Sequence, residues 1–281
     1  MLYLSYTPCA PLNEFVARMW LVSDGQSARQ ERILPGGTIE LVINLRDDRV
    51  RIDGTSDDAH AKTLSGVVVS GTYSNAFIID ARQHAAMMGV HFRPGGGVAV
   101  LGVPSVEFAN THVDLSAVWG EAAARELRER LCMAATHHAR FQYLEAALIE
   151  RLRSPLRPHP AVLFALRRFT TPAPRTSVRE VARQVGLSHR RFLTIFEAAV
   201  GLSPKVFCRI RRFQHVHAWA KRTGHIDWAQ LALECGFYDQ SHLTNEFRKL
   251  AGLTPTEYRR DIQETRNLLR GHVAVGGLRL S

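Results

Sequence analysis

Apolar residues between positions 226 and 260 recur at the spacing of two short helices. The first helix has Leu231, Ala232 and Cys235 on one side, and Gly236 follows as a stop signal. The second helix begins near Asp239 and places three apolar residues at i, i+4 and i+7: Leu243, Phe247 and Leu250. Its other face is polar and partly basic: Gln240, Ser241, Thr244, Asn245, Arg248 and Lys249. The segment therefore predicts helix, tight turn, helix.

The same pattern occurs once more upstream, in residues 177–212. Gly186 is the turn residue there, and a second helix from about Ser188 buries Phe192, Ile195 and Phe196. Its outward face carries His189, Arg190, Arg191 and Thr194. Four residues match four others at a constant offset of 51: Phe196, Gly201, Pro204 and Phe207 with Phe247, Gly252, Pro255 and Tyr258. The chain therefore contains an internal repeat.

Capping signals mark the helix starts in both copies. Ser177 with Glu180 and Asp227 with Gln230 have the spacing of capping boxes. Between the copies, a long helix is expected from Ser203 to about residue 222. Its apolar stripe is Val206, Ile210, Phe213, His217 and Ala220. A rigid helix fixes the separation of the two outward-facing helices, and two helices about 34 Å apart meet successive major-groove turns of DNA.

Residues 14–92 have a different texture, with short apolar segments separated by Gly, Pro, Asp and Ser. Strands are expected at residues 15–22, 39–45, 67–72, 76–79 and 85–92, and a solvated loop at 53–62. Helical patterns follow at residues 98–101, 115–119, 121–133 and 138–152. The expected fold class is α+β: an N-terminal β-barrel-like or sandwich domain with a helical extension, then an all-α domain of two helix-turn-helix units joined by a long helix.

The proline-rich segment at residues 154–160 predicts the boundary between the domains. We expect a β-rich sensory or dimerisation domain at residues 1–153, the helix-turn-helix domain at 154–265 and a flexible tail at 266–281. The helix at residues 138–152 has one apolar stripe: Phe141, Leu144, Leu148 and Leu152. That stripe could meet a second copy of the chain or pack inside its own subunit.

Charge is divided unevenly between the two halves. Residues 154–281 carry 21 Lys and Arg against 9 Asp and Glu, whereas residues 1–153 carry 15 against 17. The basic half coincides with the repeat, as expected of a domain that gains affinity for nucleic acid by releasing counterions. A basic surface that serves only solubility is the plainer alternative.

The four cysteines, Cys9, Cys132, Cys208 and Cys235, have none of the spacings of zinc sites or disulfide frameworks. Buried thiols in a reducing cytoplasm are expected. The first residues lack the pattern of a signal peptide, and no apolar run is long enough to span a bilayer. We therefore expect a cytoplasmic protein without membrane contact.

The C-terminal part resembles the DNA-binding domain of the AraC/XylS family of bacterial transcription regulators. The resemblance covers residues 159–260 and is carried by the repeat and by one set of residues: Ala232, Gly236, Phe237, Phe247, Gly252, Thr254, Pro255, Tyr258 and Arg259. Family members often have arginine at the positions of Thr194 and Asn245, and an aromatic residue at that of His242. These departures concern which DNA sequence is read. The resemblance implies a sequence-specific, ligand-responsive regulator that partners double-stranded DNA, with RNA polymerase, a small-molecule effector and a second subunit as further candidate partners.

Outward residues of the two second helices are the candidates for reading bases: His189, Arg190, Arg191, Thr194, Gln240, Ser241, His242 and Asn245. Arginine pairs with guanine and asparagine or glutamine with adenine. Candidates for phosphate contacts are Arg209, Arg212, Arg248 and Lys249, together with the helix N-termini near Val178 and Trp228.

The N-terminal half offers a weaker resemblance, to a β-rich domain found in one subgroup of the same family. It is carried by LPGGTIELVINL and GVHFRPGG. A ligand pocket there would use polar residues near strands: Arg32, Glu40, His91 and Arg93.

RPGGG lacks the Gly-Lys-Ser/Thr ending of a phosphate-binding loop, and a turn feeding a short helix is the better interpretation. His84 and His91 are seven residues apart, on opposite sides of a regular strand, so no metal site and no cofactor are expected.

Two other classes of function compete with this one. A DNA-linked enzyme, such as an alkyl-transfer repair protein, would need a cysteine with basic neighbours, and neither Cys9 nor Cys132 has them. The sequence also lacks G-x-S-x-G and H-E-x-x-H, so no catalytic residue is proposed. A protein that binds nucleic acid without sequence preference would not need two reading helices at a fixed spacing.

Overall fold

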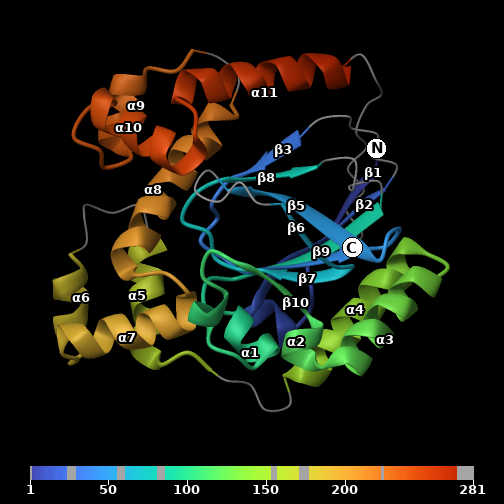
Figure 1. Ribbon diagram of the computed structural model, residues 1–281. Helices are drawn as coiled ribbons and strands as arrows, with labels where there is room; N and C mark the ends of the chain where they lie inside the picture. Colours follow the sequence, from blue (N-terminus) through green and yellow to red (C-terminus); the bar gives the residue numbers. More distant parts are fainter. Residues whose placement is uncertain are drawn as a thin grey trace.

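The computed structural model describes residues 2–23, 30–55, 61–80, 86–152, 157–170, 177–222 and 225–270. The N-terminal half forms two antiparallel sheets with helices on one side, and the C-terminal half is helical (Figure 1). Residues 153–156, in the linker region, and 271–281, in the expected tail, lie outside the described ranges. Helix α11 (Pro255–Arg270) extends beyond position 266, where that tail was expected to begin.

The larger sheet has six strands in the order β1-β2-β9-β4-β7-β10. These are β1 (Leu2–Tyr6), β2 (Val16–Ser23), β9 (Ala86–Phe92), β4 (Glu40–Asn44), β7 (Val67–Ser70) and β10 (His112–Asp114). Alternation along the strands gives this sheet two different faces. On β2, Met19 and Leu21 enter the main core, whereas Arg18 and Trp20 point to the opposite face.

The smaller sheet has four strands in the order β3-β8-β5-β6. They are β3 (Gln30–Ile33), β8 (Phe77–Asp80), β5 (Arg49–Thr55) and β6 (Lys62–Ser65). A small cluster of Val50, Ile52, Val68, Tyr73 and Phe77 joins it to the larger sheet. Among the described residues the strand ladders form two separate sheets, so the sandwich alternative holds and the closed barrel does not.

The expected strands occur within a few residues of their predicted positions, but several others were missed. Those missed are β1, β3, β5, β6 and β10. Strand β5 alternates charged Arg49 and Arg51 with buried Val50 and Ile52, which weakens its apolar signal. It runs to Thr55, into the segment expected to be a loop, and residues 56–60 of that segment lie outside the described ranges.

Helices cover the outer face of the larger sheet. They are α1 (Gly97–Leu101), α2 (Ser116–Trp119), α3 (Glu121–Met133) and α4 (His137–Arg151), with 3-10 turns η1 (Leu12–Glu14) and η3 (Ser105–Phe108). The α4 residues Phe141, Leu144 and Leu148 are fully buried in the same core as strand residues such as Leu41. The apolar stripe of this helix therefore packs inside its own subunit, the second of the two alternatives.

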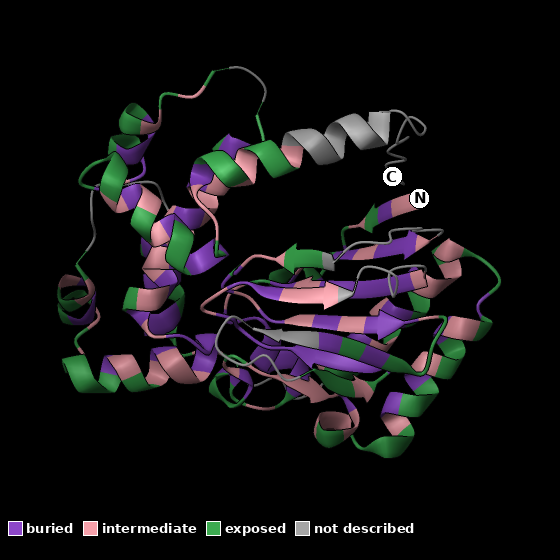
Figure 2. Cartoon of the chain, turned by 45° about the horizontal axis from the view of Figure 1, so that its top comes forward, coloured by how far each residue is buried: buried purple, intermediate pink, exposed green. Residues whose placement is uncertain are grey.

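The C-terminal half contains α5 (Pro160–Thr170), α6 (Val178–Gln184), α7 (His189–Val200), α8 (Pro204–Ala220), α9 (Trp228–Glu234), α10 (Gln240–Ala251) and α11. The long helix α8 contributes to a core that contains residues of both copies, including Phe196 and Phe247. Its buried stripe is Phe207, Ile210, Phe213, Val216 and Ala220, so Val206 and His217 lie beside that stripe rather than in it. Figure 2 shows how buried and exposed residues mix along these helices.

Candidate nucleic-acid interface and ligand cavity

The two copies form the same tight turn. Gly186 and Gly236 adopt φ values of 70° and 78°, which glycine tolerates without strain. The next residues donate backbone hydrogen bonds back into the preceding helix, Leu187 N to Ala182 O at 3.1 Å and Phe237 N to Ala232 O at 2.8 Å. These bonds satisfy carbonyls at the ends of α6 and α9. The structure thus contains two helix-turn-helix units, α6–α7 and α9–α10.

Side chains cap the second helix of each unit. Ser188 Oγ accepts from Arg191 N at 3.3 Å, and Asp239 Oδ1 accepts from His242 N at 2.7 Å. The expected Ser177 cap is wrong, because its side chain accepts no capping bond. Asp227 does cap α9, but the Gln230 amide bonds Glu234 instead of reaching back.

A complete capping box, which was not among the predicted ones, occurs at the start of α11. Glu257 N donates to Thr254 Oγ1 at 3.2 Å, and Thr254 N donates to Glu257 Oε2 at 2.7 Å. The Thr254 backbone N–H and hydroxyl both donate to the Glu257 carboxylate, and these two bonds lower the pKa of that carboxyl. The T-x-x-E pattern of residues 254–257 was the available signal.

The second unit has one extra residue in its turn. Helix α9 starts 50 residues after α6, whereas α10 starts 51 residues after α7. The turn of the second unit therefore accommodates Tyr238, which is 71% exposed. Its ring stacks on His242 at 5.3 Å, and its backbone N–H donates to His242 Nδ1 at 3.3 Å.

The candidate base-reading side chains are exposed, with one exception. Exposed residues are His189, Arg190, Arg191 and Thr194 on α7, and Gln240, Ser241 and Asn245 on α10. The N-terminal domain therefore does not bury either face. The Thr194 hydroxyl donates to Arg190 O at 3.1 Å inside the helix. The exception is His242, which is half-buried between Tyr238 and Phe237.

The four candidates for phosphate contacts fall into two groups. Arg248 and Lys249 are exposed. Arg209 is half-buried and donates to Glu246 Oε2 at 2.7 Å, joining α8 to α10. Burial is the largest influence and raises the pKa of Glu246, but the bond from Arg209 and the charges of Arg209, Lys249 and His242 together outweigh it, and the net pKa is lowered. Arg212 donates to Gly236 O at 3.1 Å and lies over the Phe237 ring. Arg209 and Arg212 therefore hold the second unit against α8.

The N-terminal domain contacts the ends of both second helices. Gly201, which ends α7, lies so close to Thr72 and Ser105 that a Cβ there would sit 2.7 Å from Ser105 O. At the end of α10, Arg32 Nη1 donates to Ala251 O at 3.0 Å and Ala76 N donates to Leu250 O at 2.8 Å. One domain therefore braces both units at equivalent points of the repeat.

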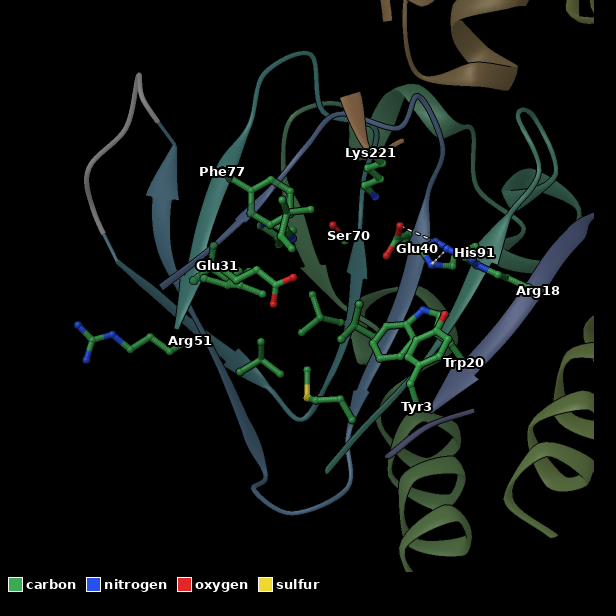
Figure 3. A pocket seen from close by; sticks show the side chains of 18 residues that line it. Tyr3, Arg18, Trp20, Glu31, Glu40, Arg51, Ser70, Phe77, His91 and Lys221 are labelled. Atoms are coloured by element: carbon green, nitrogen blue, oxygen red, sulfur yellow. Dashed lines mark hydrogen bonds and ion pairs between the residues drawn. The ribbon is translucent and has the colours of Figure 1, made fainter. Parts of the chain in front are cut away.

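A cavity of about 470 Å³ lies between the two sheets. Alternate residues of five strands line it, as the two-residue period of a strand requires. The pairs are Glu31 and Ile33, Glu40 and Val42, Val50 and Ile52, Val68 and Ser70, and Phe77 and Ile79. Among the described lining residues, Lys221, the C-cap of α8, comes from the C-terminal half, and its side chain points into the cavity (Figure 3).

The four candidates for a pocket lie in three different places. Glu40 and His91 line the cavity and bond each other. Arg32 points to Ala251, and Arg93 Nε donates to Asn13 O at 2.8 Å. Sequence reasoning missed Trp20, Glu31 and Lys221. The alternation on β3 could have assigned Glu31 and Arg32 to opposite faces, but Lys221 comes from the other domain and left no local signal.

Hydrogen bonding fixes the tautomer of His91. Arg18 has only N–H donors, so His91 Nε2, at 3.2 Å from Arg18 Nη2, accepts. His91 Nδ1 must then carry the ring hydrogen and donate a hydrogen bond to Glu40. The Arg18 guanidinium is engaged on the far side of this ring, away from the cavity centre (Figure 3).

Two side chains in the cavity wall contain buried nitrogen atoms without a hydrogen-bond partner. They are Trp20 Nε1 and both ring nitrogens of His112. The His112 ring packs against Tyr73 and Phe77, at 4.8 Å from each, and burial lowers its pKa to about 3. Unpaired buried polar atoms cost about 1–3 kcal/mol each, so a wall built for stability alone would not keep them.

The remaining candidate chemistry is sparse within the described part of the chain. No group of three or more potential metal-binding side chains occurs there, and His84 lies outside it. Burial raises the pKa of the Cys208 and Cys235 thiols to about 11, which disfavours the reactive thiolate.

The RPGGG segment forms the turn before α1, with Gly96 packed against the Phe15 backbone. None of the helices in the described ranges has the length and apolar character needed to cross a bilayer.

The paired units and the exposed faces define the C-terminal half as a double helix-turn-helix domain. Residues 181–261 match the family described as "Helix-turn-helix domain", and residues 4–114 match "Domain of unknown function (DUF6597)". A helix-turn-helix domain, similar to those of the AraC-type regulators named below, thus follows a domain of unknown function.

Curated relatives match less than a third of the chain. The virulence regulon transcriptional activator VirF of Yersinia enterocolitica is 31% identical over 78 residues, which cover 28% of each chain. The chain thus matches less than a third of that relative's length. An AraC-type regulator structure from Chromobacterium violaceum is 24% identical with a TM-score of 0.33, covering 37% of this chain and 92% of that one. An apo structure of ToxT from Vibrio cholerae, carrying a single substitution, is 11% identical with a TM-score of 0.46, covering 86% and 97%.

Proposed function

We propose that this protein is a sequence-specific DNA-binding transcription regulator whose N-terminal domain adjusts the placement of the two reading helices. The observation that carries this proposal is the duplicated helix-turn-helix unit with both outward faces exposed. Helices α7 and α10 would enter the major groove, and their outward residues would contact base edges. The surplus of basic residues in this half would supply attraction to phosphates.

Phosphate contacts are divided by geometry in this proposal. Arg248 and Lys249 are exposed in the last turn of α10 and would approach the DNA backbone directly. Arg209 and Arg212 would act chiefly by orienting the second unit, because their guanidinium groups bond Glu246 and Gly236. The N-terminus of α6, where Ser177 makes no capping bond, would offer backbone N–H groups to a phosphate as well, whereas at α9 the Asp227 carboxylate already accepts from Ala229 N and Gln230 N.

The cavity is proposed as the site of a small-molecule effector. It is of the size of typical ligand pockets, mainly apolar and supplied with a few convergent polar groups. Its wall includes Lys221 from the end of α8, so an occupant would touch both halves of the chain. RNA polymerase and a second copy of the chain are further proposed partners. A cytoplasmic location follows from the proposed action on DNA.

Selection from a random double-stranded DNA library tests the proposal. The purified chain should enrich a motif with two separate boxes, and footprinting should show both boxes protected on one face of the duplex. A control protein with Arg190→Ala and Asn245→Ala should lose the motif while retaining its circular dichroism spectrum. Enrichment of no sequence, with binding that disappears at about 200 mM salt, would support the unspecific nucleic-acid-binding alternative instead.

A further inference from the structure

The charged groups that point into the cavity have a net acidic balance. Glu31 comes from β3 in one sheet and Glu40 from β4 in the other, and the ammonium of Lys221 is the cationic group directed inward (Figure 3). Arg51 also belongs to the wall, but its side chain points away from the centre. The Arg18 guanidinium bonds His91 on the side away from the cavity. Among the described lining residues, two carboxylates and one ammonium are thus directed into the interior.

Aromatic faces complete this environment. Tyr3 and Trp20 line the side of the larger sheet, and Phe77 lines the side of the smaller one. Gly89 pairs with Trp20 across the ladder, and a Cβ at Gly89 would lie 2.5 Å from the indole ring. The glycine therefore allows the indole to lie across β9. Aromatic faces attract cations and carboxylates pair with them, whereas an anion would meet two like charges.

We propose that the cavity binds an organic cation: an amine or quaternary ammonium group near Glu31 and Glu40, carried on an apolar or aromatic body that packs against Trp20 and Phe77. The rest of the lining suits such a body, because Ile33, Val42, Ile52, Val68 and Ile79 supply apolar surface. The ligand's charge competes with the Lys221 ammonium for the acidic side of the cavity.

Two features connect the cavity to the second helix-turn-helix unit: Lys221 and the neighbour of Glu31 on β3. Lys221 caps the C-terminus of α8, and the chain continues from there toward α9. On β3, Glu31 faces the cavity while its neighbour Arg32 donates to Ala251 O at the end of α10. A ligand that engages Glu31 and displaces Lys221 therefore acts on two supports of the α9–α10 unit. This coupling rests on the proposed DNA-binding function, whereas the ligand class does not.

Three probes with one body and different head groups test the ligand class: 4-phenylbutylamine, 4-phenylbutanol and 4-phenylbutanoate. Isothermal titration calorimetry of the full chain at pH 7.5, without DNA, should give the tightest binding for the amine. The alcohol should bind roughly tenfold more weakly or worse, and the carboxylate should not bind measurably. Equal binding of the amine and the alcohol would overturn the proposal, and so would failure of all amines in a wider panel.

Variants separate the ligand's contacts from general stability. Glu31→Gln should raise the Kd of the amine roughly tenfold, whereas Glu129→Gln, on the exposed surface of α3, should leave it unchanged. Lys221→Met should lower the Kd of the amine, an effect that loss of folding could not produce. Tight binding of the carboxylate that disappears in Lys221→Met would instead assign the cavity to anions.

The coupling is tested by a separate measurement. Arg32→Ala should bind 4-phenylbutylamine with unchanged Kd but lose the ligand's effect on affinity for the selected DNA. If the chain binds no specific DNA, the proposed function fails and the calorimetric result still decides the ligand class. If DNA binding is specific and the ligand effect survives in Arg32→Ala, the β3 route is wrong.

Discussion

Individual arginines in the helix-turn-helix half have different tasks, and their hydrogen bonds distinguish them. Arg190 is exposed on α7, whereas Arg209 and Arg212 reach across to Glu246 and Gly236. An exposed guanidinium keeps its donors for a base edge or phosphate. A guanidinium that already bonds a carboxylate or carbonyl contributes to the position of the helix that carries its partner.

Alanine substitutions should separate base reading from phosphate binding. Arg190→Ala or Asn245→Ala should weaken binding to the selected site by about 1–3 kcal/mol and relax preference at one position. Lys249→Ala should weaken all DNA sequences alike and reduce the salt dependence. Fluorescence anisotropy on selected and random duplexes measures both effects. Equal losses on both duplexes for all three variants would contradict this division.

Local sequence predicted the exposed faces of α7 and α10 because helical periodicity determines which side of an amphipathic helix faces outward. It could not distinguish Arg209 and Arg212 from arginines that remain available. The partner of Arg209 is Glu246 on α10, 37 residues away along the chain. The partner of Arg212 is Gly236 in the turn before α10, 24 residues away. The same limit applies to the cavity. The alternation of strand residues could have predicted that Glu31 faces it, but no local pattern could have predicted that Lys221 does.

At the scale of elements, two glycines of the first helix-turn-helix unit have different roles. Gly186 and Gly201 both adopt positive φ, at 70° and 79°. A Cβ at Gly186 would meet nothing within 4 Å, whereas a Cβ at Gly201 would clash with Thr72 and Ser105 of the other domain. The first glycine serves only its own turn, and the second also lets the N-terminal domain approach α7.

Matched substitutions at these glycines should differ in their cost. Gly186→Ala should destabilise by about 1–2 kcal/mol, from the left-handed backbone alone. Gly201→Ala should destabilise by about 3 kcal/mol or more, because backbone atoms of the interface must also move. Chemical denaturation of both proteins measures the difference. Similar losses would indicate that the contact with Ser105 adjusts without strain.

The packing of α8 against α11 should depend on pH through His217. Its ring stacks on Phe213 and contacts Tyr258 at 5.4 Å, and burial lowers its pKa to about 4. The unfolded chain binds this proton near pH 6.5, so the stability contribution is complete above that pH and is lost as pH falls toward 4.

Comparison with His217→Leu isolates this effect from other titrating groups. Between pH 7.5 and pH 5, the wild-type chain should lose about 1–2 kcal/mol relative to the variant. Urea denaturation at the two pH values provides the measurement. A stability difference that stays constant over this range would mean that the histidine titrates normally in the folded chain.

At the scale of the whole molecule, the N-terminal domain supports both helix-turn-helix units. It touches the end of α7 through Thr72 and Ser105, and the end of α10 through Arg32 and Ala76. Between them, Gln214 of α8 donates to Pro35 O. Helix α8 alone spans about 25 Å from its 17 residues, so these contacts add a second constraint on how the units are spaced.

Removing one support should loosen one unit selectively. Arg32→Ala should accelerate amide hydrogen exchange near the end of α10 by roughly tenfold, while the end of α7 remains protected. Arg93→Ala is the control, because Arg93 bonds Asn13 within the N-terminal domain. Mass spectrometry of exchanged peptides can resolve the two helix ends. Uniform acceleration across both units would show that they move as one body.

Tyr238 makes the two halves of the repeat unequal. The second turn is longer by this residue, and its ring occupies the space beside His242 at the entrance to α10. A duplicated reader with identical halves would recognise two identical boxes, and exchanging those boxes would change nothing. Unequal halves give the bound chain a direction along the double helix. Reversing the order of the two boxes in a promoter should therefore abolish recognition.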